Sequence, residues 1–469
     1  MTIADPLRAR LMIAVAALAG AGCVPHAELE VAPEVLSTQW SQPPAPATAA
    51  GPSAPGAAAQ AMPADLGLAF HSAELSALIA RAARANTDVA IAGARIRQAR
   101  ALLRNARGAM LPVVSASGGM TADQTRSRTT NPFDFRHAFA GIDISFDLDL
   151  FGAGRAEGDA ARSRLRAALF DREVALLVVQ TEVARAYVQR ATLAARIAIL
   201  QHNIADAVEL ERIIRARFTA GDATRVDLGL QTIQVRQLQT DGQRLAQALD
   251  QTRTALAVLV GEEAPRFALA PAALDSLSAP AIAPALPGEL VTRRPDIRAA
   301  EARIDAAGGD VRQARAAFFP RLTLSAGSLS QLSLGAPFAT TISLGAGLLA
   351  PIFNRGRLRG NLEYSAAQQV ESVELYRQIL LTSLAEVEDA LSAVARSSER
   401  EALLIDIVRE AQLTARLARM QYVGGEADLQ RVLDAEQRLS EAEDARAIAQ
   451  QERLEAAIDL FKALGGAAA

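Results

Sequence analysis

Residues 106–119 read ARGAMLPVVSASGG, and residues 314–327 read ARAAFFPRLTLSAG. Three further pairs of matching segments occur in the same order in the two halves: DVAIAGARI at 88–96 with DIRAAEARI at 296–304, DLFGAGR at 149–155 with PIFNRGR at 351–357, and RFTAGDA at 217–223 with QYVGGEA at 421–427. Matches that keep their order indicate an internal duplication. Chance similarity between alanine-rich helices would not place Pro112 and Pro320 at equivalent points.

Each half is expected to contain a helix that ends at its proline, two strands, and two long helices separated by a glycine turn. Repeat 1 is predicted at 66–261, with strands at about 111–125 and 137–150 and long helices at 155–219 and 224–260. A linker is predicted at 262–289. Repeat 2 is predicted at 290–466, with a helix at 295–317, strands at about 320–332 and 338–351, and long helices at 357–422 and 427–465. Apolar residues in the long helices alternate at steps of three and four, as in coiled coils. At about 1.5 Å per residue such helices reach about 100 Å, which favours a tube or a rod.

The clearest strand, AFAGIDISFDLDL at 138–150, has an apolar face and an acidic face. In a soluble sheet the acidic face would meet water, whereas in an outer-membrane barrel the apolar face meets lipid and Asp143, Asp147 and Asp149 line the lumen. Phenylalanines gathered near the strand ends favour the barrel, because aromatic belts mark the membrane boundaries. Four strands cannot close a barrel, so copies must combine. Twelve strands from three copies leave a lumen, whereas eight tend to fill with side chains.

The N-terminus has the features of an export signal. Arg8 and Arg10 precede an apolar run that is too short to span a bilayer, so residues 1–22 are predicted to be a lipoprotein signal peptide. Cys23, the only cysteine, is the expected site of lipid attachment. Gly20 departs from the leucine that is usual in lipoboxes, which leaves an ordinary signal peptide as the alternative. Residues 23–65, rich in Pro, Ala, Gly and Ser, are predicted to form a tether.

Composition argues against two classes of function. The net charge of −3 provides no basic field for nucleic acid. The four histidines are scattered without metal-ligand spacing, and no phosphate loop or nucleophile motif occurs, so neither an enzyme nor a cofactor is expected. Hydrophobic residues make up 50% of the chain but aromatic residues only 4%, which favours helices.

Several segments together resemble a known family. They are GELVTRRPDIRAAEARI, RQARAAFFPRLTLSAG, RFTAGDATRVDL and QYVGGEADLQRVLDAEQRL. The chain resembles the outer-membrane factor family, or TolC superfamily, and within it the lipoprotein branch that serves efflux pumps of the resistance-nodulation-division (RND) type. The resemblance implies a mainly α fold with membrane β: a homotrimer with a 12-stranded β-barrel, four strands per chain, that continues through a mixed equatorial region into a long α-helical barrel.

The same resemblance implies a location and partners. The channel would lie in outer-membrane lipid and extend, lipid-anchored, into the periplasm. It would passively conduct substrates received from a periplasmic adaptor protein and an inner-membrane RND-type pump. The residues do not indicate which substrate is exported.

The family pattern also implies an iris-like gate at the periplasmic tip, formed here by Asp227, Tyr422, Arg431 and Asp434. A hydrogen bond between Asp227 and Tyr422 would hold the resting gate closed. The tip turns, with Arg217, Gly221, Gly424 and Gly425, would dock the adaptor. The sequence departs from the pattern at two positions, Arg431 instead of aspartate and Ala427 instead of the arginine of some members. Arg431 either neutralises a ring of Asp434 carboxylates or forms an ion pair on the helix surface, and the residues leave both open.

Two alternatives remain open from the sequence. A type I protein-secretion duct would share the fold and differ in cargo. A lipid-anchored periplasmic coiled-coil scaffold would explain the long helices but not the four duplicated strands. Pore formation would separate the scaffold from the channel.

Overall fold

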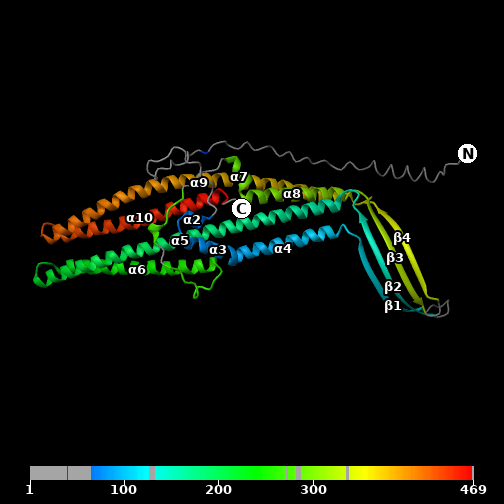
Figure 1. The fold of residues 1–469 in the computed structure, drawn as a ribbon, viewed down its shortest axis with the longest axis horizontal. Coiled ribbons are helices and arrows are strands. Elements are labelled where there is room, and N and C mark those ends of the chain that lie inside the picture. The colour runs from blue at the N-terminus through cyan, green and yellow to red at the C-terminus, as the bar shows by residue number, and fades with distance from the viewer. Residues whose placement is uncertain are drawn as a thin grey trace. The chain divides into compact units, whose positions relative to one another are not determined.

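The computed structural model describes residues 40, 65–125, 133–270, 273–280, 287–333 and 337–466. The predicted signal peptide, Cys23 and nearly all of the tether lie outside the described residues. The described chain divides into two compact units that alternate along the sequence (Figure 1). Unit 1 includes residues 95–169 and 299–378, and unit 2 includes 170–298 and 379–469, with 34–94 added.

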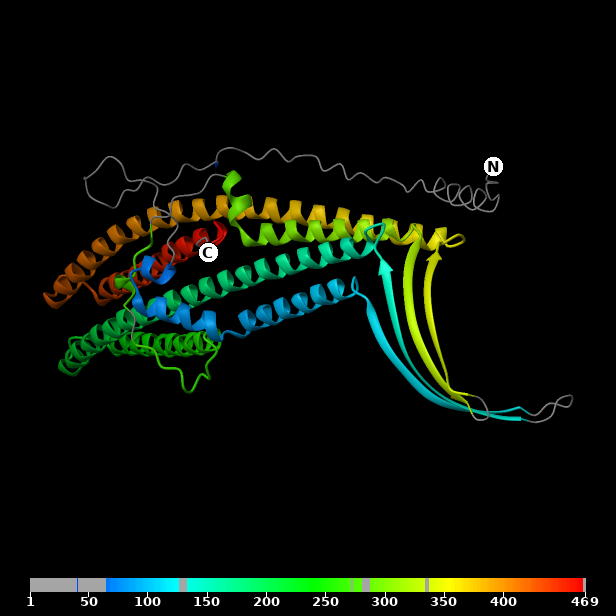
Figure 2. The ribbon, with the colours of Figure 1, turned by 45° about the vertical axis from the view of Figure 1, so that its right-hand side comes forward.

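Unit 1 contains an antiparallel sheet of four strands in the order β1-β2-β3-β4, which Figure 2 shows side by side. The strands are β1 Val113–Thr125, β2 Phe133–Leu148, β3 Arg321–Ser333 and β4 Ala339–Leu349. β2 of the first repeat pairs with β3 of the second, so the two repeats share one sheet. β1 and β4 are its edges, and each leaves one row of backbone groups unpaired within the chain.

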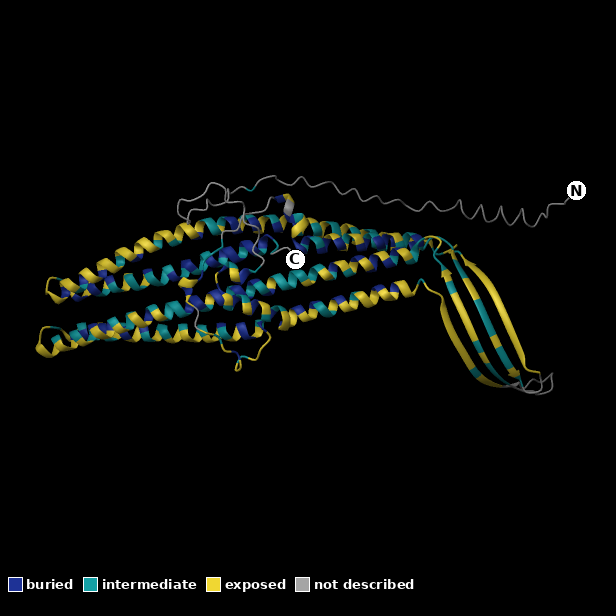
Figure 3. Ribbon diagram, viewed as in Figure 1, coloured by how far each residue is buried: buried dark blue, intermediate teal, exposed yellow. Residues whose placement is uncertain are grey.

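The strand register separates apolar from polar side chains. Asp143 lies opposite Ser115 on β1 and Gly327 on β3. The next residue, Ile144, lies opposite Val114 and Ala326. Because successive side chains point to opposite faces, this register places most of the large apolar residues of the four strands on one face, whereas Leu329 and Leu349 lie on the face of Asp143. Figure 3 shows much of the strand surface as exposed, and Leu344 on β4 is 84% exposed. The apolar face is therefore not covered within the chain.

In unit 1, helices of the two repeats pack against each other next to the sheet. They are the C-terminal part of α4 Thr87–Gly108, most of α8 Pro295–Ala316, and the first parts of α5 Ala153–Ala220 and α9 Arg355–Val423. Gly309 on α8 allows close packing, since a Cβ there would lie 2.8 Å from the Cβ of Ala160 on α5. The rings of Phe151 and Phe319 stack with centroids 4.7 Å apart. The two repeats are thereby joined at the strand-helix junction.

Unit 2 contains the remaining helices. They are α2 Leu66–Ala69, α3 Ala73–Ala85, α6 Arg225–Leu259, α7 Pro287–Arg293 and α10 Leu429–Ala463, the 3-10 helix η1 Leu274–Ser276, and the long C-terminal parts of α5 and α9. Its largest core packs Phe70 and Leu75 from the N-terminal helices against Val183 on α5, Leu256 on α6 and Phe461 on α10. Helices from both repeats and the linker between them thus share one core.

The two long helices have nearly equal lengths, 68 residues for α5 and 69 for α9. Each spans about 100 Å at the usual rise of 1.5 Å per residue. They contain the predicted helical ranges 155–219 and 357–422 and begin two residues earlier. No helix in the described ranges is both long and apolar enough to cross a membrane.

Candidate functional site

Four helix ends meet at one end of unit 2, where the turns between α5 and α6 and between α9 and α10 lie together (Figure 1). One apolar cluster joins them, with Leu210 and Ile214 from α5, Leu228 from α6, Tyr422 from α9 and Val432 from α10. This tip cluster contains side chains from both repeats, so the tip is a single packed structure rather than two separate hairpins.

The two tip turns have the same backbone geometry. The N–H of Asp222 donates to the carbonyl of Arg217 at 2.9 Å, and the N–H of Glu426 donates to the carbonyl of Gln421 at 2.8 Å. Gly221 and Gly425 adopt φ of +88° and +80°, a left-handed conformation that glycine accepts without strain. Gly424 lies outside this left-handed region. Of the three predicted turn glycines, Gly221 and Gly425 therefore close the turns.

Asp227 stabilises the start of α6. One of its carboxylate oxygens accepts hydrogen bonds from the backbone N–H and the hydroxyl of Thr224, both at 2.8 Å, and the Thr224 hydroxyl accepts from the N–H of Asp227. This capping box lowers the pKa of Asp227, through the backbone hydrogen bond first and then the hydroxyl. The predicted hydrogen bond between Asp227 and Tyr422 is absent within the chain, because the local cap three residues away binds the carboxylate instead.

Tyr422 contacts Arg217. The guanidinium carbon of Arg217 lies 4.5 Å from the centroid of the Tyr422 ring. The Arg217 Nη2 also donates to the carbonyls of Tyr422 and Val423, at 3.3 Å each. Arg217, expected at the turn for adaptor docking, is thus bound against the end of the helix of the other repeat. The second repeat has Gln421 at the position equivalent to Arg217. This difference between the repeats is the feature of the sequence that indicates the contact.

Arg431 and Asp434 do not contact each other. Asp434 is exposed and accepts a hydrogen bond from the side chain of Gln430 at 2.9 Å. The Arg431 side chain is exposed and forms no ion pair with a described residue, while its N–H donates to Asp428 at the helix cap. The predicted helix-surface ion pair of Arg431 is therefore not formed within the chain. Neutralisation of an Asp434 ring involves other copies and stays a prediction.

A charged cluster farther from the turns was not singled out from the sequence. Arg419 on α9 lies 3.2 Å from Glu436 on α10 and 3.7 Å from Asp206 on α5, and it also donates to the carbonyl of Asp206. His202, one turn before Asp206, lies 3.9 Å from its carboxylate. Because these residues come from three helices, sequence spacing does not bring them together.

Burial raises the pKa of Glu436 above its ordinary value of 4.5, and the charge of Asp206 adds to this, although Arg419 opposes it. Because the pKa of Glu436 is raised in the folded state, the protonated carboxyl stabilises the fold. This stabilisation is complete below about pH 4.5 and is lost as the pH rises through the folded-state pKa of Glu436. We expect Glu436→Gln to remove this pH-dependent step from the melting temperature measured across pH 4 to 8. Glu443→Gln, which changes a side chain paired with Gln412, should keep the step. Equal profiles for Glu436→Gln and the wild type would contradict the assignment.

The predicted lumen acids lie in unit 1 and differ in placement. Asp143 and Asp147 are on the polar face of β2, and Asp147 accepts a hydrogen bond from Thr323 at 2.5 Å. Asp149 lies past the end of β2, where it accepts from the N–H and the Nε of Arg155 at 2.9 and 3.3 Å. Burial raises its pKa, but hydrogen bonds from the backbone of Arg155 and Gly154 outweigh this and lower it. The strand thus ends two residues earlier than predicted, and the carboxylate of Asp149 binds the first turn of α5. Its position in the lumen, which only several copies would form, stays a prediction.

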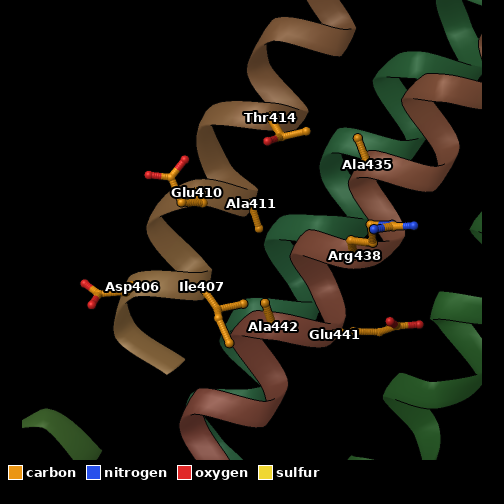
Figure 4. A pocket seen from close by; sticks show the side chains of 9 residues that line it. All are labelled: Asp406, Ile407, Glu410, Ala411, Thr414, Ala435, Arg438, Glu441 and Ala442. Atoms are coloured by element: carbon orange, nitrogen blue, oxygen red, sulfur yellow. The ribbon is translucent and has the colours of Figure 1, made fainter. Parts of the chain in front are cut away.

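An open groove runs between α9 and α10 on their shared hairpin, with a volume of about 670 Å³ (Figure 4). Ile407, Ala411, Ala435 and Ala442 form its apolar part. Asp406, Glu410, Arg438 and Glu441 also line it. An apolar groove between two helices, with charges beside it, has the shape and chemistry that accept a further helix.

Comparison with known proteins identifies the family. A family model described as "Outer membrane efflux protein" matches residues 78–262 and 286–466, which are one segment in each repeat. The pyoverdine export outer membrane protein OpmQ of Pseudomonas putida is 35% identical over 417 residues, covering 85% of this chain and 87% of that protein. The solvent efflux pump outer membrane protein SrpC of Pseudomonas putida is 29% identical, covering 85% and 86%.

Solved structures share the fold. The outer-membrane channel OprN superposes with a TM-score of 0.81 at 26% identity, covering 87% of this chain and 94% of that one. CusC, the subject of a study of transmembrane channel formation, superposes with a TM-score of 0.79 at 25% identity, covering 88% and 99%. The fold is thus that of TolC-like channels, in which a strand barrel continues into a helical barrel, with four strands supplied by each chain.

These matches establish the class of protein. The chain is a channel and not an enzyme, it is located in the outer membrane and reaches into the periplasm, and it works as a homotrimer with a periplasmic adaptor and an inner-membrane pump. The chain belongs to the outer membrane efflux protein family, as the outer-membrane channel of a tripartite efflux system.

Proposed function

We propose that the trimer forms a tunnel that is closed at rest at the helical tip, where the α5-α6 and α9-α10 turns of each chain meet. The observation that carries this proposal is the tip cluster, which packs four helix ends of both repeats together while Asp434 stays exposed on the first turns of α10. Three copies would bring three Asp434 carboxylates around one axis. A ring of carboxylates favours cations in a narrow aqueous pore.

A small molecule is the proposed cargo. The OpmQ relatives from Pseudomonas putida and Pseudomonas aeruginosa, both 35% identical, are named for pyoverdine export, and SrpC is named for solvent efflux. These names support small-molecule export over the type I protein-secretion alternative. The scaffold alternative provides no role for a sheet whose apolar face is uncovered.

Adaptor docking and lipid anchoring complete the proposal. Gly221 and Gly425 lie at the exposed turns and suit a docking surface at the tip. Arg217 is already bound to α9, so its contribution to docking would be indirect. We retain Cys23 as the proposed lipid attachment site and residues 23–65 as the tether.

Planar-bilayer recordings of the purified trimer test the tip as the constriction. We expect the wild type to form small, cation-preferring pores, because the Asp434 ring lies at the narrowest point. Asp434→Asn should move the cation-to-anion permeability ratio toward unity, as measured from the reversal potential in a salt gradient. Glu443→Gln removes a charge that faces Gln412 on α9 and should leave the ratio unchanged.

The possible results distinguish a wrong assignment of the channel from a wrong assignment of Asp434. A wild-type protein that forms no pores would contradict the channel itself. Pores whose selectivity is the same in Asp434→Asn and the wild type would instead remove Asp434 from the constriction.

A further inference from the structure

A second pocket lies within unit 1, where the strands join the helices. This junction pocket is open and has a volume of about 470 Å³. Arg155 and Asp159 line it from the first turns of α5, and Arg312 and Arg315 line it from the last turns of α8. The stacked rings of Phe151 and Phe319 also line it. Three arginines and two phenylalanines therefore surround one cavity.

The junction pocket has an excess of positive charge. Asp159 forms an ion pair with Arg162 at 2.8 Å, and Arg155 forms one with Asp149 at 3.3 Å. The lining residues and these two partners together include four arginines and two aspartates, which leaves two positive charges. Arg312 is exposed and forms no ion pair or hydrogen bond with a described residue. The pocket thus presents a guanidinium to an anion from outside the chain.

Both repeats contain the arginines of this pocket. The segment RNARGAMLP at 104–112 matches RQARAAFFP at 312–320, and FGAGR at 151–155 matches FNRGR at 353–357. Arg104, Arg107 and Arg357 therefore stand at the positions of Arg312, Arg315 and Arg155.

Neighbouring charges of the same helices differ between the repeats. Asp305 of α8 pairs with Arg166, but Arg97 stands at its position in α4. Asp310 pairs with Arg164, but the position of Asp310 is a leucine in α4. Ion pairs between the helices thus differ between the two copies, whereas the junction arginines are present in both. These arginines are retained for a reason other than such ion pairs.

The equivalent arginines lie at the two edges of unit 1. Arg104 and Arg107 end α4 next to the edge strand β1, and Arg357 begins α9 next to the edge strand β4. All three side chains are exposed. Closing the barrel of the homotrimer brings β4 of one copy beside β1 of the next. We therefore expect the same set of three arginines to recur between copies.

Large apolar side chains at the junction are also exposed. Phe151 is 48% exposed and Phe353 is 103% exposed, and Leu111 and Ile352 are exposed as well. Phe151 follows the end of β2 by three residues, which is at most about 11 Å of chain. The headgroup region extends about 5–7 Å beyond the hydrocarbon core. The apolar face of the sheet thus continues into a level where exposed aromatic rings meet headgroups rather than bulk water.

We propose that the junction pocket binds the phosphate of a phospholipid from the periplasmic leaflet of the outer membrane, with a preference for anionic headgroups. Arg312 donates to the phosphate oxygens, while Arg155 and Arg315 add positive charge. A guanidinium fits a phosphate because it presents two parallel donors. The exposed ring of Phe151 packs against the start of the acyl chains. The site is separate from the helical tip and does not depend on the gate.

Native mass spectrometry of the trimer in detergent measures the lipids that the protein retains. We expect phosphatidylglycerol to bind severalfold more tightly than phosphatidylcholine, whose quaternary ammonium partly neutralises its own phosphate. Arg312→Gln should weaken the binding of phosphatidylglycerol about tenfold, because a hydrogen bond between charged groups is lost. Arg312→Lys keeps the charge and should recover part of the affinity.

Arg95→Gln is the matched control. It removes another exposed arginine of unit 1, about 20 Å from the end of α4. We expect Arg95→Gln to bind phosphatidylglycerol like the wild type. Melting temperatures of the trimers verify that each variant is folded and assembled before lipid binding is compared.

Inorganic phosphate distinguishes a lipid from a soluble anion. We expect millimolar phosphate to displace little phosphatidylglycerol, since it lacks the acyl chains that contact Phe151. Displacement of the lipid at that concentration would make a soluble anion the ligand and overturn the lipid assignment. Equal affinities for the two phospholipids would show that charge is not recognised. Equal loss of affinity in Arg312→Gln and Arg95→Gln, or no loss in either, would remove the pocket from lipid binding.

Discussion

Leu344→Arg is expected to prevent stable insertion of the trimer into the outer membrane. Leu344 lies in the middle of β4, is 84% exposed, and shares the apolar face of the sheet with its partner Ala326 on β3. An arginine on the lipid face of a membrane barrel costs about 2–4 kcal/mol at the bilayer midplane. Three copies repeat the cost, so the total is comparable to the stability of an ordinary domain.

Ser343→Arg is the matched control, because it adds the same side chain one residue earlier on the opposite face. Ser343 lies opposite Gly327, whose missing side chain leaves room on the polar face. We expect Ser343→Arg to insert and to alter ion selectivity only. Fractionation of outer membranes and gel migration of unheated trimers measure both variants. Equal insertion of the two variants would show that the apolar face does not meet lipid.

Arg294→Ala is expected to destabilise unit 2 by about 3 kcal/mol. The Arg294 side chain is 8% exposed, forms ion pairs at 2.7 Å with Asp296 and with Glu386 on α9, and donates to the carbonyl of Ala463 at the end of α10. Removing one partner of a buried ion pair costs about 3–5 kcal/mol. The lower end applies because both carboxylates remain partly exposed to solvent.

The neighbouring Arg293 is exposed, so Arg293→Ala provides the control and should change stability by less than about 1 kcal/mol. Thermal unfolding monitored by circular dichroism compares the two variants. Arg294→Lys should recover part of the loss, because lysine keeps the charge but cannot bind both carboxylates in the same planar geometry. Equal melting temperatures for the two alanine variants would contradict a structural role for Arg294.

In the sheet, local sequence is sufficient to predict which face each side chain occupies. The alternation of Ile142, Asp143, Ile144 and Ser145 has the period of a strand, and the observed register separates the same residues onto two faces. The prediction succeeded because side-chain direction in a strand depends only on position along it. The predicted end of this strand at residue 150 was wrong, because β2 ends at Leu148 and the carboxylate of Asp149 binds the start of α5.

The tip illustrates the opposite case. The family pattern implied a hydrogen bond between Asp227 and Tyr422, yet Asp227 binds Thr224 in a cap that a local motif can form. The partner of Tyr422 is Arg217, about two hundred positions away in the sequence. Spacing could show that the repeats differ at Arg217 and Gln421, but not which of these two side chains would cover an aromatic ring.

The sequence alone determined the duplication, the order of helices and strands, the two faces of the sheet and the turns at Gly221 and Gly425. All of these depend on residues a few positions apart, whose backbone preferences and periodicity act locally. Tertiary structure alone decided that Arg217 caps α9, that Arg419 joins Glu436 to Asp206, and that Arg294 ties α9 to the end of α10. Long arginine side chains have many acceptors within reach, and only the packing of distant helices selects among them.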